Sequence, residues 1–146
     1  MLMRRLTRRT LLASVVATAV IACRNREPEG GVTRVSVELG EYYIKVDKAE
    51  VDAGTVRFVA RNVGQMDHEL VVLRTDLPAD QLPYSDATEE VEEEKAGEVL
   101  GEIEPEDVPP GKTAEMTLDL TPGQYVLLCN IPTHYKLGMY REFRVR

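Results

Sequence analysis

The sequence has few of the residues from which catalytic and metal centres are usually built. Its 146 residues include two histidines, two cysteines, two phenylalanines and no tryptophan. Two histidines are too few for an enzyme with several imidazole-ligated metal centres, and two cysteines permit at most one disulfide. The one long apolar run, Leu11 to Ala22, is too short to span a bilayer, so no transmembrane helix is predicted.

Length and composition predict one packed domain. Removing the targeting segment described below, residues 1–22, leaves 124 of the 146 residues. That is enough chain for a single buried core and too little for two. Hydrophobic residues make up 43% of the chain and charged residues 29%, a balance typical of globular proteins rather than disordered or membrane-embedded ones.

Acidic residues outnumber basic ones, and the excess lies in the body of the chain. The formal charge is −7, but four of the 18 basic residues are arginines within the first 22 positions. The remainder therefore has 14 basic and 25 acidic residues, or −11. A surface of this sign repels nucleic acid and attracts a basic protein face. We therefore predict no nucleic-acid partner.

The first 22 residues have the features of a signal peptide. Arg4, Arg5, Arg8 and Arg9 form a basic segment ahead of the apolar run. The sequence TRRTLL at residues 7–12 resembles the twin-arginine export signal, whose users often acquire a cofactor before export. The expected destination is outside the cytoplasm.

The sequence VIAC, which ends at Cys23, resembles a lipobox, in which the cysteine is lipidated and becomes the new N-terminus. On this interpretation Cys23 is a membrane anchor, and the polar residues 23–31 form a short tether. The protein would be a lipoprotein in the periplasm or on the outer face of the cytoplasmic membrane. Ordinary cleavage nearby, which would leave Cys23 unpaired, is the alternative.

Residues 32–146 are predicted to form a small all-β domain. Apolar residues recur at period two in several segments, which is typical of half-buried strands. Turn residues separate these segments at intervals typical of a β-sandwich. Strands are expected over residues 35–39, 56–60, 68–74, 114–120, 124–129 and 142–146, with turns at 52–54, 62–64, 109–111 and 121–123.

The segment from Thr75 to Asp107 departs from this pattern. It contains the acidic run EEVEEEK at residues 89–95 and few regularly spaced apolar residues. We interpret it as an excursion from the sandwich, an acidic loop or short helix that is solvated at the surface. A docking patch for a cationic partner is the alternative.

Three side chains that bind soft metals fall within eleven residues near the C-terminus. Cys129 ends a predicted strand, His134 follows five residues later, and Met139 follows after five more. Thiolate and thioether stabilise Cu(I), and imidazole also accepts Cu(II), so the combination suits a copper ion that changes oxidation state. The remaining imidazole is that of His68, at the start of a distant predicted strand.

These two segments resemble the signature segments of the cupredoxin family. The Asn62-Val63-Gly64 turn lies ahead of His68, and the loop from Cys129 to Met139 lies near the C-terminus. The resemblance covers residues 32–146, and the loop spacing is most similar to that of the rusticyanin and sulfocyanin branch. It implies a Greek-key β-sandwich with one type 1 copper ion.

The resemblance also implies a role for each ligand. His68, Cys129 and His134 would form the trigonal ligand plane, and Met139 would be the long axial ligand. The protein would carry single electrons between redox protein partners such as a cytochrome or a terminal oxidase, with the exposed loop around His134 as the port. A water-excluding apolar rim is expected from Ile131, Pro132, Leu137 and Tyr140.

One position departs from the family pattern. Glu69 follows His68, where several cupredoxins have an asparagine that joins the two ligand segments. Whether Asn130 or Thr133 replaces that tether is open at this point. Met66, two residues before His68, is interpreted as a core-packing side chain, with a competing sulfur ligand as the alternative.

Other functions are less consistent with the sequence. A Cys–His nucleophile would not need the methionine, and no motif for a small-molecule substrate is present, so the chain is not predicted to be an enzyme. Structural zinc usually has four strong ligands in paired short spacings. A copper carrier or metallochaperone, and an accessory cupredoxin subunit of a respiratory oxidase complex, remain as alternatives.

Overall fold

The computed structural model describes residues 31–146. The predicted signal peptide, the lipidation site Cys23 and residues 23–30 of the predicted tether lie outside this part of the chain. Within the described residues, no helix is long and apolar enough to cross a membrane. The predicted all-β fold is confirmed, because the described part contains eleven strands and one helix of four residues.

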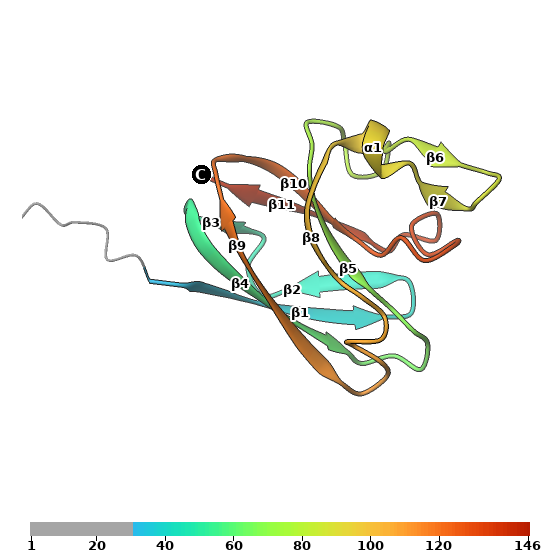
Figure 1. Cartoon of the computed structure of the whole chain (residues 1–146), viewed down its shortest axis with the longest axis horizontal. Helices are drawn as coiled ribbons and strands as arrows, with labels where there is room; N and C mark the ends of the chain where they lie inside the picture. Colours follow the sequence, from blue (N-terminus) through green and yellow to red (C-terminus); the bar gives the residue numbers. More distant parts are fainter. Residues whose placement is uncertain (1–30) are drawn as a thin grey trace, which may run out of the picture.

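The strands form two main sheets that pack face to face (Figure 1). Strands β1 and β4 pair in parallel, as do β3 and β11, and the other pairs in these sheets are antiparallel. The four-stranded sheet has the order β2 (Tyr43–Val46), β1 (Thr33–Gly40), β4 (Gly54–Asn62), β9 (Thr113–Leu120). The five-stranded sheet has the order β3 (Glu50–Val51), β11 (Tyr140–Val145), β10 (Gly123–Leu128), β5 (Leu70–Arg74), β8 (Glu98–Ile103).

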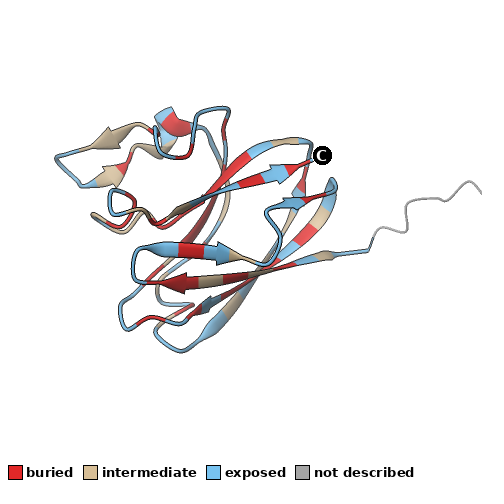
Figure 2. Ribbon diagram, turned by 180° about the vertical axis from the view of Figure 1, so that it is seen from behind, coloured by how far each residue is buried: buried red, intermediate tan, exposed pale blue. Residues whose placement is uncertain are grey.

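The main core lies between these sheets and follows the period-two pattern of the sequence. Most of the buried residues of β1 and β4 lie at alternate positions, although Phe58, Val59 and Ala60 are all buried, and Figure 2 shows buried residues interspersed with intermediate and exposed ones along the two strands. The rings of Phe58 from β4 and Phe143 from β11 meet edge to face, with centroids 5.5 Å apart. This contact joins the two sheets through their largest apolar side chains.

Strands β5 and β10 differ from the others because they are buried on both faces. All residues of β5 except Arg74 are buried, and so are the last four of β10. Their outer face is covered by the excursion, which contains β6 (Tyr84–Ser85), β7 (Glu90–Val91) and helix α1 (Glu93–Ala96). The residues of this second apolar cluster are Val71, Leu73, Ala79, Leu82, Val91, Ala96, Val126, Leu128 and Tyr135.

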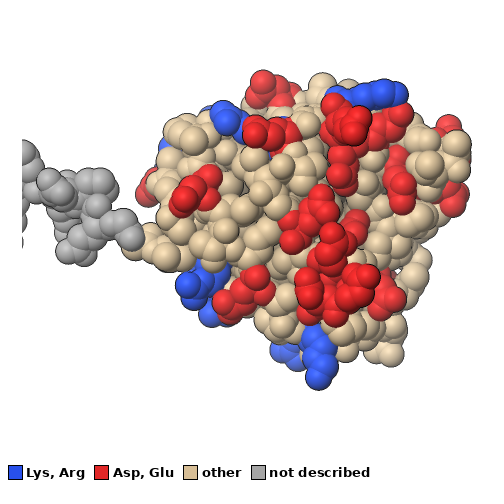
Figure 3. Space-filling model, viewed as in Figure 1, with Lys and Arg blue, Asp and Glu red and all other residues tan. Residues whose placement is uncertain are grey.

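The interpretation of residues 75–107 as a solvated loop or short helix is therefore wrong in part. The short helix is present, but the segment also supplies the edge strand β8 and the buried residues that cover β5 and β10. Its charge is at the surface, where Figure 3 shows acidic side chains as a band across the face that α1 and β8 form. The structure also adds β2 and β3, two short strands that the pattern did not predict.

Candidate metal centre

The loop between β10 and β11 brings Cys129 and Met139 together. These strands pair antiparallel with Leu128 opposite Tyr140, so the loop begins and ends at adjacent positions. The N–H of Cys129 donates to the carbonyl of Met139 at 3.1 Å, and the N–H of Met139 donates to the carbonyl of His134 at 3.0 Å. The backbone of Met139 is thus bonded to both of the other predicted ligands in the loop.

Two residues with positive φ turn this loop. Thr133 has φ of 73° and Gly138 has φ of 105°. A glycine adopts the second conformation without strain, whereas threonine needs support from its surroundings. The N–H groups of His134 and Gly138 close tight turns by donating to Ile131 and Tyr135. The loop is therefore fixed by its own hydrogen bonds on either side of His134.

His68 comes from a second loop, between β4 and β5, which the buried side chain of Asn62 organises. The Asn62 amide accepts from the N–H of Gly64 at 3.0 Å and donates to the carbonyls of Met66 at 2.9 Å and Val108 at 3.2 Å. The Asn62-Val63-Gly64 turn predicted from the sequence is thus held by the asparagine itself. β5 then pairs with β10, which places His68 beside Cys129.

The three strongest predicted ligands converge on one point. The candidate ligand atoms of His68, Cys129 and His134 all lie within 4.8 Å of one another. The Cys129 Sγ is 3.3 Å from Nδ1 of His134, and the two imidazole rings have centroids 5.2 Å apart. His68 and Cys129 are fully buried, as is Met139, and His134 is 3% exposed. The structure thus brings three of the predicted ligands together in one buried site, and the buried Met139 is hydrogen-bonded through its backbone to two of them, Cys129 and His134.

The imidazole of His68 has no explanation as an ordinary buried polar group. Both ring nitrogens are buried and neither has a hydrogen-bond partner. A buried polar atom without a partner costs about 1–3 kcal/mol. Burial, with a smaller contribution from His134, lowers the pKa of His68, and burial also lowers the pKa of His134. Both rings are then neutral at pH 7 and can donate a nitrogen lone pair to a metal.

Cys129 is the only cysteine among the described residues, and it is unpaired and buried. Burial raises the pKa of its thiol to about 11, although the backbone N–H of Glu69 approaches the sulfur at 3.4 Å and favours the thiolate. A bound cation reverses this preference, because coordination deprotonates a thiol. Two neutral imidazoles, one thiolate and one thioether fit copper, which uses both nitrogen and soft sulfur ligands.

Glu69 itself joins the two ligand segments. Its N–H donates to Cys129 Sγ, and its carboxylate accepts a hydrogen bond of 2.6 Å from the N–H of Asn130. Neither the side chain of Asn130 nor Thr133 makes this link. The tether between the two segments is therefore Glu69, the residue that departs from the family pattern. The pKa of Glu69 is raised to about 7, mainly by burial and also by the nearby carboxylates, although the hydrogen bond from the Asn130 N–H lowers it.

The surroundings of His134 differ from the predicted apolar rim. Tyr140 is half-buried and packs on Tyr135, with ring centroids 5.1 Å apart, so it belongs to the second cluster. Its place is taken by Tyr42, whose ring meets the ring of His134 edge to face at 5.4 Å. The loop around His134 was predicted to be exposed, but His134 itself is buried. Leu137, three residues later in the same loop, is 54% exposed. Tyr42 was missed because nothing in its local sequence distinguishes it from a surface tyrosine.

The interpretation of Met66 as a core residue is wrong. Its side chain is 41% exposed, and its sulfur accepts a long contact of 3.8 Å from the hydroxyl of Tyr42. Met139, in contrast, is fully buried within the main core. Of the two methionines considered as sulfur ligands, Met139 is the one that lies in the buried site.

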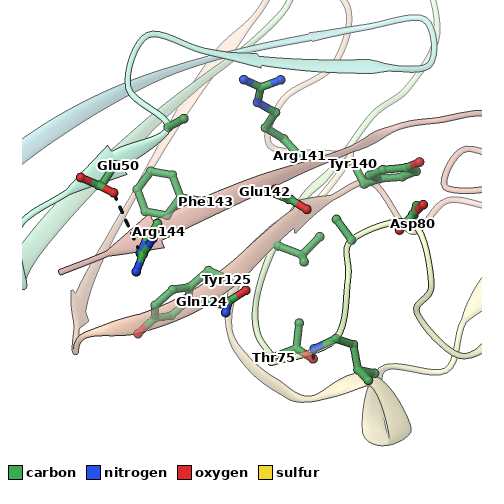
Figure 4. Close-up of a pocket in the computed structure, with 14 residues that line it drawn as sticks. Glu50, Thr75, Asp80, Gln124, Tyr125, Tyr140, Arg141, Glu142, Phe143 and Arg144 are labelled. Carbon is green, nitrogen blue, oxygen red and sulfur yellow. Dashed lines mark hydrogen bonds and ion pairs between the residues drawn. The ribbon is translucent and has the colours of Figure 1, made fainter.

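A separate pocket of about 710 Å³ opens on the outer face of β10 and β11 (Figure 4). Its polar wall includes Glu50 and Arg144, which form an ion pair at 4.0 Å. None of the four predicted ligands lines it. The pocket is therefore not part of the candidate metal centre.

Comparisons with known proteins identify the fold. No family model matches the chain, and no curated protein matches it in sequence. Reduced auracyanin from the photosynthetic bacterium Roseiflexus castenholzii is 20% identical, with a TM-score of 0.57 over 80% of this chain and 99% of that protein. Rusticyanin from Thiobacillus ferrooxidans is 18% identical, with a TM-score of 0.56 over 80% of this chain and 79% of that protein.

A third solved structure is described as that of a "blue" copper protein. It is auracyanin A from Chloroflexus aurantiacus, which is 22% identical, with a TM-score of 0.52 over 77% of this chain and 99% of that protein. The chain therefore has the cupredoxin fold seen in auracyanin and rusticyanin, and its buried His68, Cys129, His134 and Met139 are a ligand set typical of a type 1 copper site.

Proposed function

We propose that this protein binds one type 1 copper ion through His68, Cys129, His134 and Met139 and carries single electrons between extracytoplasmic redox proteins. The observation that supports this most strongly is the buried cluster of His68, Cys129 and His134 with both nitrogens of His68 unpartnered. Copper in such a site cycles between Cu(I) and Cu(II). The auracyanin and rusticyanin structures are similar in fold and support the same assignment.

The protein's contribution is to hold the ligands rigid and dry. Three of them come from one hydrogen-bonded loop, and the fourth is fixed by the Asn62 network and by the pairing of β5 with β10. Ligands that keep their positions when the metal changes charge allow electron transfer with little rearrangement. Burial excludes water, which would otherwise compete for the metal.

The burial of the ligands also disfavours the role of a copper carrier. A carrier must exchange its metal with another protein, which requires ligands that the receiving protein can reach. His134, the least buried of the four ligands, is only 3% exposed. An accessory subunit of a respiratory oxidase complex would use the same site for the same electron transfer. The copper spectrum of the purified protein tests the site in either case.

We further propose that the protein is exported and attached to the membrane by a lipid on Cys23. The support is the lipobox-like sequence VIAC and the polar residues that follow it. β1 begins at Thr33, near the start of the described residues, and runs toward the end of the sandwich where the β10–β11 loop lies (Figure 1). Eight strand residues span about 26 Å, so a tether before β1 would leave the metal centre facing away from the membrane.

The partner is a redox protein, and we propose that it presents a basic face. A groove of about 500 Å³ next to Asn130 is lined by Glu69, Glu93 and Glu102, among other residues. Burial raises the pKa of Glu102, as do the neighbouring carboxylates of Glu93 and Glu104, which shows how closely these acids are packed. A cationic surface would relieve this repulsion and would be steered toward the side of the metal centre.

The proposal is tested with the purified full-length protein in detergent, to which one equivalent of Cu(II) is added. We expect an intense visible band from the thiolate and a narrow copper hyperfine splitting, with the band lost on reduction by ascorbate and regained on reoxidation. A pale solution with an ordinary Cu(II) spectrum would contradict a type 1 site and would favour the carrier function.

A further inference from the structure

The loop between β10 and β11, residues 129–139, carries three of the candidate ligands and is called the ligand loop. It also makes contacts on the side that faces away from the metal site. Cys129 and His134 lie in the candidate metal site and Met139 is buried at the end of the loop, whereas several residues between them contact the excursion. The hydroxyl of Tyr135 accepts from the N–H of Leu82 at 3.0 Å and donates to the carbonyl of Ala79 at 2.8 Å. The loop thus lies between the metal site and a second, independent set of contacts.

Asn130 makes the closest of these contacts. Its amide oxygen accepts from the N–H of Val91 at 2.6 Å, and its amide nitrogen donates to the carbonyl of Val91 at 3.1 Å and to the carboxylate of Glu93 at 2.8 Å. The side chain therefore binds both backbone groups of one residue, as a neighbouring strand would. Its own backbone N–H is used separately, by Glu69.

A second contact joins two residues with unusual backbone conformations. The N–H of Thr133 donates to the carbonyl of Glu89 at 2.8 Å. Thr133 has φ of 73° and Glu89 has φ of 61°, and neither is a glycine. Such conformations persist only where the surroundings hold them in place. The loop from β6 to β7 and the ligand loop therefore support each other at this point, one residue before His134.

A third contact is at the surface. The ammonium of Lys136 pairs with the carboxylate of Asp86 at 2.9 Å and lies 5.0 Å from the ring centroid of Tyr84. Tyr84 in turn stacks on Tyr135, with centroids 6.1 Å apart. Four residues of the ligand loop thus contact the excursion, and they lie on both sides of His134 in the sequence. They are Asn130, Thr133, Tyr135 and Lys136.

We propose that the excursion is a scaffold that positions the ligand loop for the metal before the metal binds, and that Asn130 is the central positioning residue. The inference rests on the proposed copper site but concerns the metal-free protein as well. Without the contacts at Asn130 and Thr133, the segment between Cys129 and His134 would be held only by its own turns and by Glu69. A loop that is already in place loses less conformational freedom when its ligands bind.

The first test is amide hydrogen exchange in the metal-free full-length protein. Asn130→Ala removes the side-chain bonds to Val91 and Glu93 and keeps the backbone N–H that binds Glu69. We expect the amides of both Val91 and Thr133 to exchange about tenfold faster, since one or two hydrogen bonds of ordinary strength are lost. Thr133 is the informative amide, because its own partner, Glu89, is unchanged in the variant.

The second test is the optical spectrum, the copper hyperfine splitting and the reduction potential of the copper-loaded variant. We expect copper still to bind, with a changed spectrum and a shifted potential. Lys95→Ala is the matched control, since Lys95 lies in the excursion and its only side-chain bond is to the exposed Glu92. This control should leave exchange, spectrum and potential as in the wild-type protein.

The possible outcomes separate this inference from the proposed function. Faster exchange at Val91 alone, with Thr133, the spectrum and the potential unchanged, would show that Asn130 holds only the excursion and would overturn the inference. Wild-type protein that binds no copper would contradict the proposed function, whereas the exchange result would still decide the scaffold. If Asn130→Ala does not fold, Asn130→Ser, which can keep one of the bonds, is measured against the same criteria.

Discussion

The carboxylate of Glu69 accepts a hydrogen bond from the backbone N–H of Asn130, which joins the segment that carries His68 to the segment that carries Cys129. At 2.6 Å this bond is short, and its acceptor is half-buried. A glutamate therefore occupies the position at which several cupredoxins have an asparagine, and it joins the two ligand segments. Two predictions about stability concern Glu69.

Replacing Glu69 by alanine should lower the free energy of unfolding of the metal-free protein by about 1–3 kcal/mol, because the N–H of Asn130 loses its partner in a half-buried setting. Glu69→Gln keeps an acceptor oxygen and should be closer to the wild-type protein. Urea denaturation of the three proteins measures the difference. Equal stability of the alanine variant and the wild type would show that the bond does not hold the two segments together.

The titration of Glu69 should lower the free energy of unfolding of the metal-free protein as the pH rises. Burial raises its pKa in the folded state to about 7 from an ordinary value of 4.5, so between these values the folded protein binds more protons than the unfolded chain. Stability then falls with rising pH across this window. Glu69→Gln removes the titration, so its stability relative to wild type should increase from pH 4.5 to pH 7. A difference that does not change with pH would contradict the raised pKa.

Cys129→Ser should remove the intense visible band of the copper-loaded protein, because the thiolate is the source of the charge transfer. The sandwich should remain folded, because Cys129 is only one of the many buried residues of the main core and serine is similar to cysteine in size. Absorbance and far-ultraviolet circular dichroism measure the two effects. Cys23→Ala is the matched cysteine control and should retain the band. An intact band in Cys129→Ser would exclude Cys129 as a ligand.

Metal binding should release a proton from Cys129. The pKa of its thiol in the metal-free protein is about 11, whereas the pKa values of His68 and His134 are lowered and these rings are already neutral at pH 7. The apparent affinity for Cu(I) should therefore rise roughly tenfold for each pH unit above neutrality until the thiol ionises. Competition with a Cu(I) chelator over this range measures it. An affinity independent of pH would mean that no thiolate is formed on binding.

Cys23→Ala should release the protein from membranes without changing its copper spectrum, because the predicted anchor lies before β1 and the ligands lie within the sandwich. Fractionation of cells that express each form, with detection of the protein in soluble and membrane fractions, measures the change. A variant that stays in the membrane fraction would contradict attachment through Cys23.

The sandwich and its ligands could be predicted because they depend on regular patterns. The period-two residues of β1 and β4 become the core, and the spacing from Cys129 to Met139 corresponds to one loop between paired strands. The uninterrupted apolar run at the end of β10 was also a signal, since a strand buried on both faces shows no alternation. This run could have indicated the layer over the outer face that the excursion supplies, but that layer was not predicted.

The excursion and Tyr42 could not be predicted in the same way. The apolar residues of the excursion, such as Ala79, Leu82 and Val91, are widely spaced, and they become a core only against β5 and β10. The contact between Tyr42 and His134 depends on where the β1–β2 turn lies relative to a loop far along the chain. Such contacts arise from tertiary packing, and local sequence patterns do not reveal them.

The hydrogen bond from Glu69 to Cys129 joins residues 60 positions apart, and the core strands β1 and β4 pair in parallel, which also needs a long connection. Folds that depend on such distant contacts form slowly, since the chain must close large loops before it gains much stabilisation. The ligands of a partly folded chain are scattered along its length. Only molecules that have completed the fold can take up copper at this site. The intensity of the blue band of a copper-loaded preparation would therefore measure the fraction of its molecules that are correctly folded.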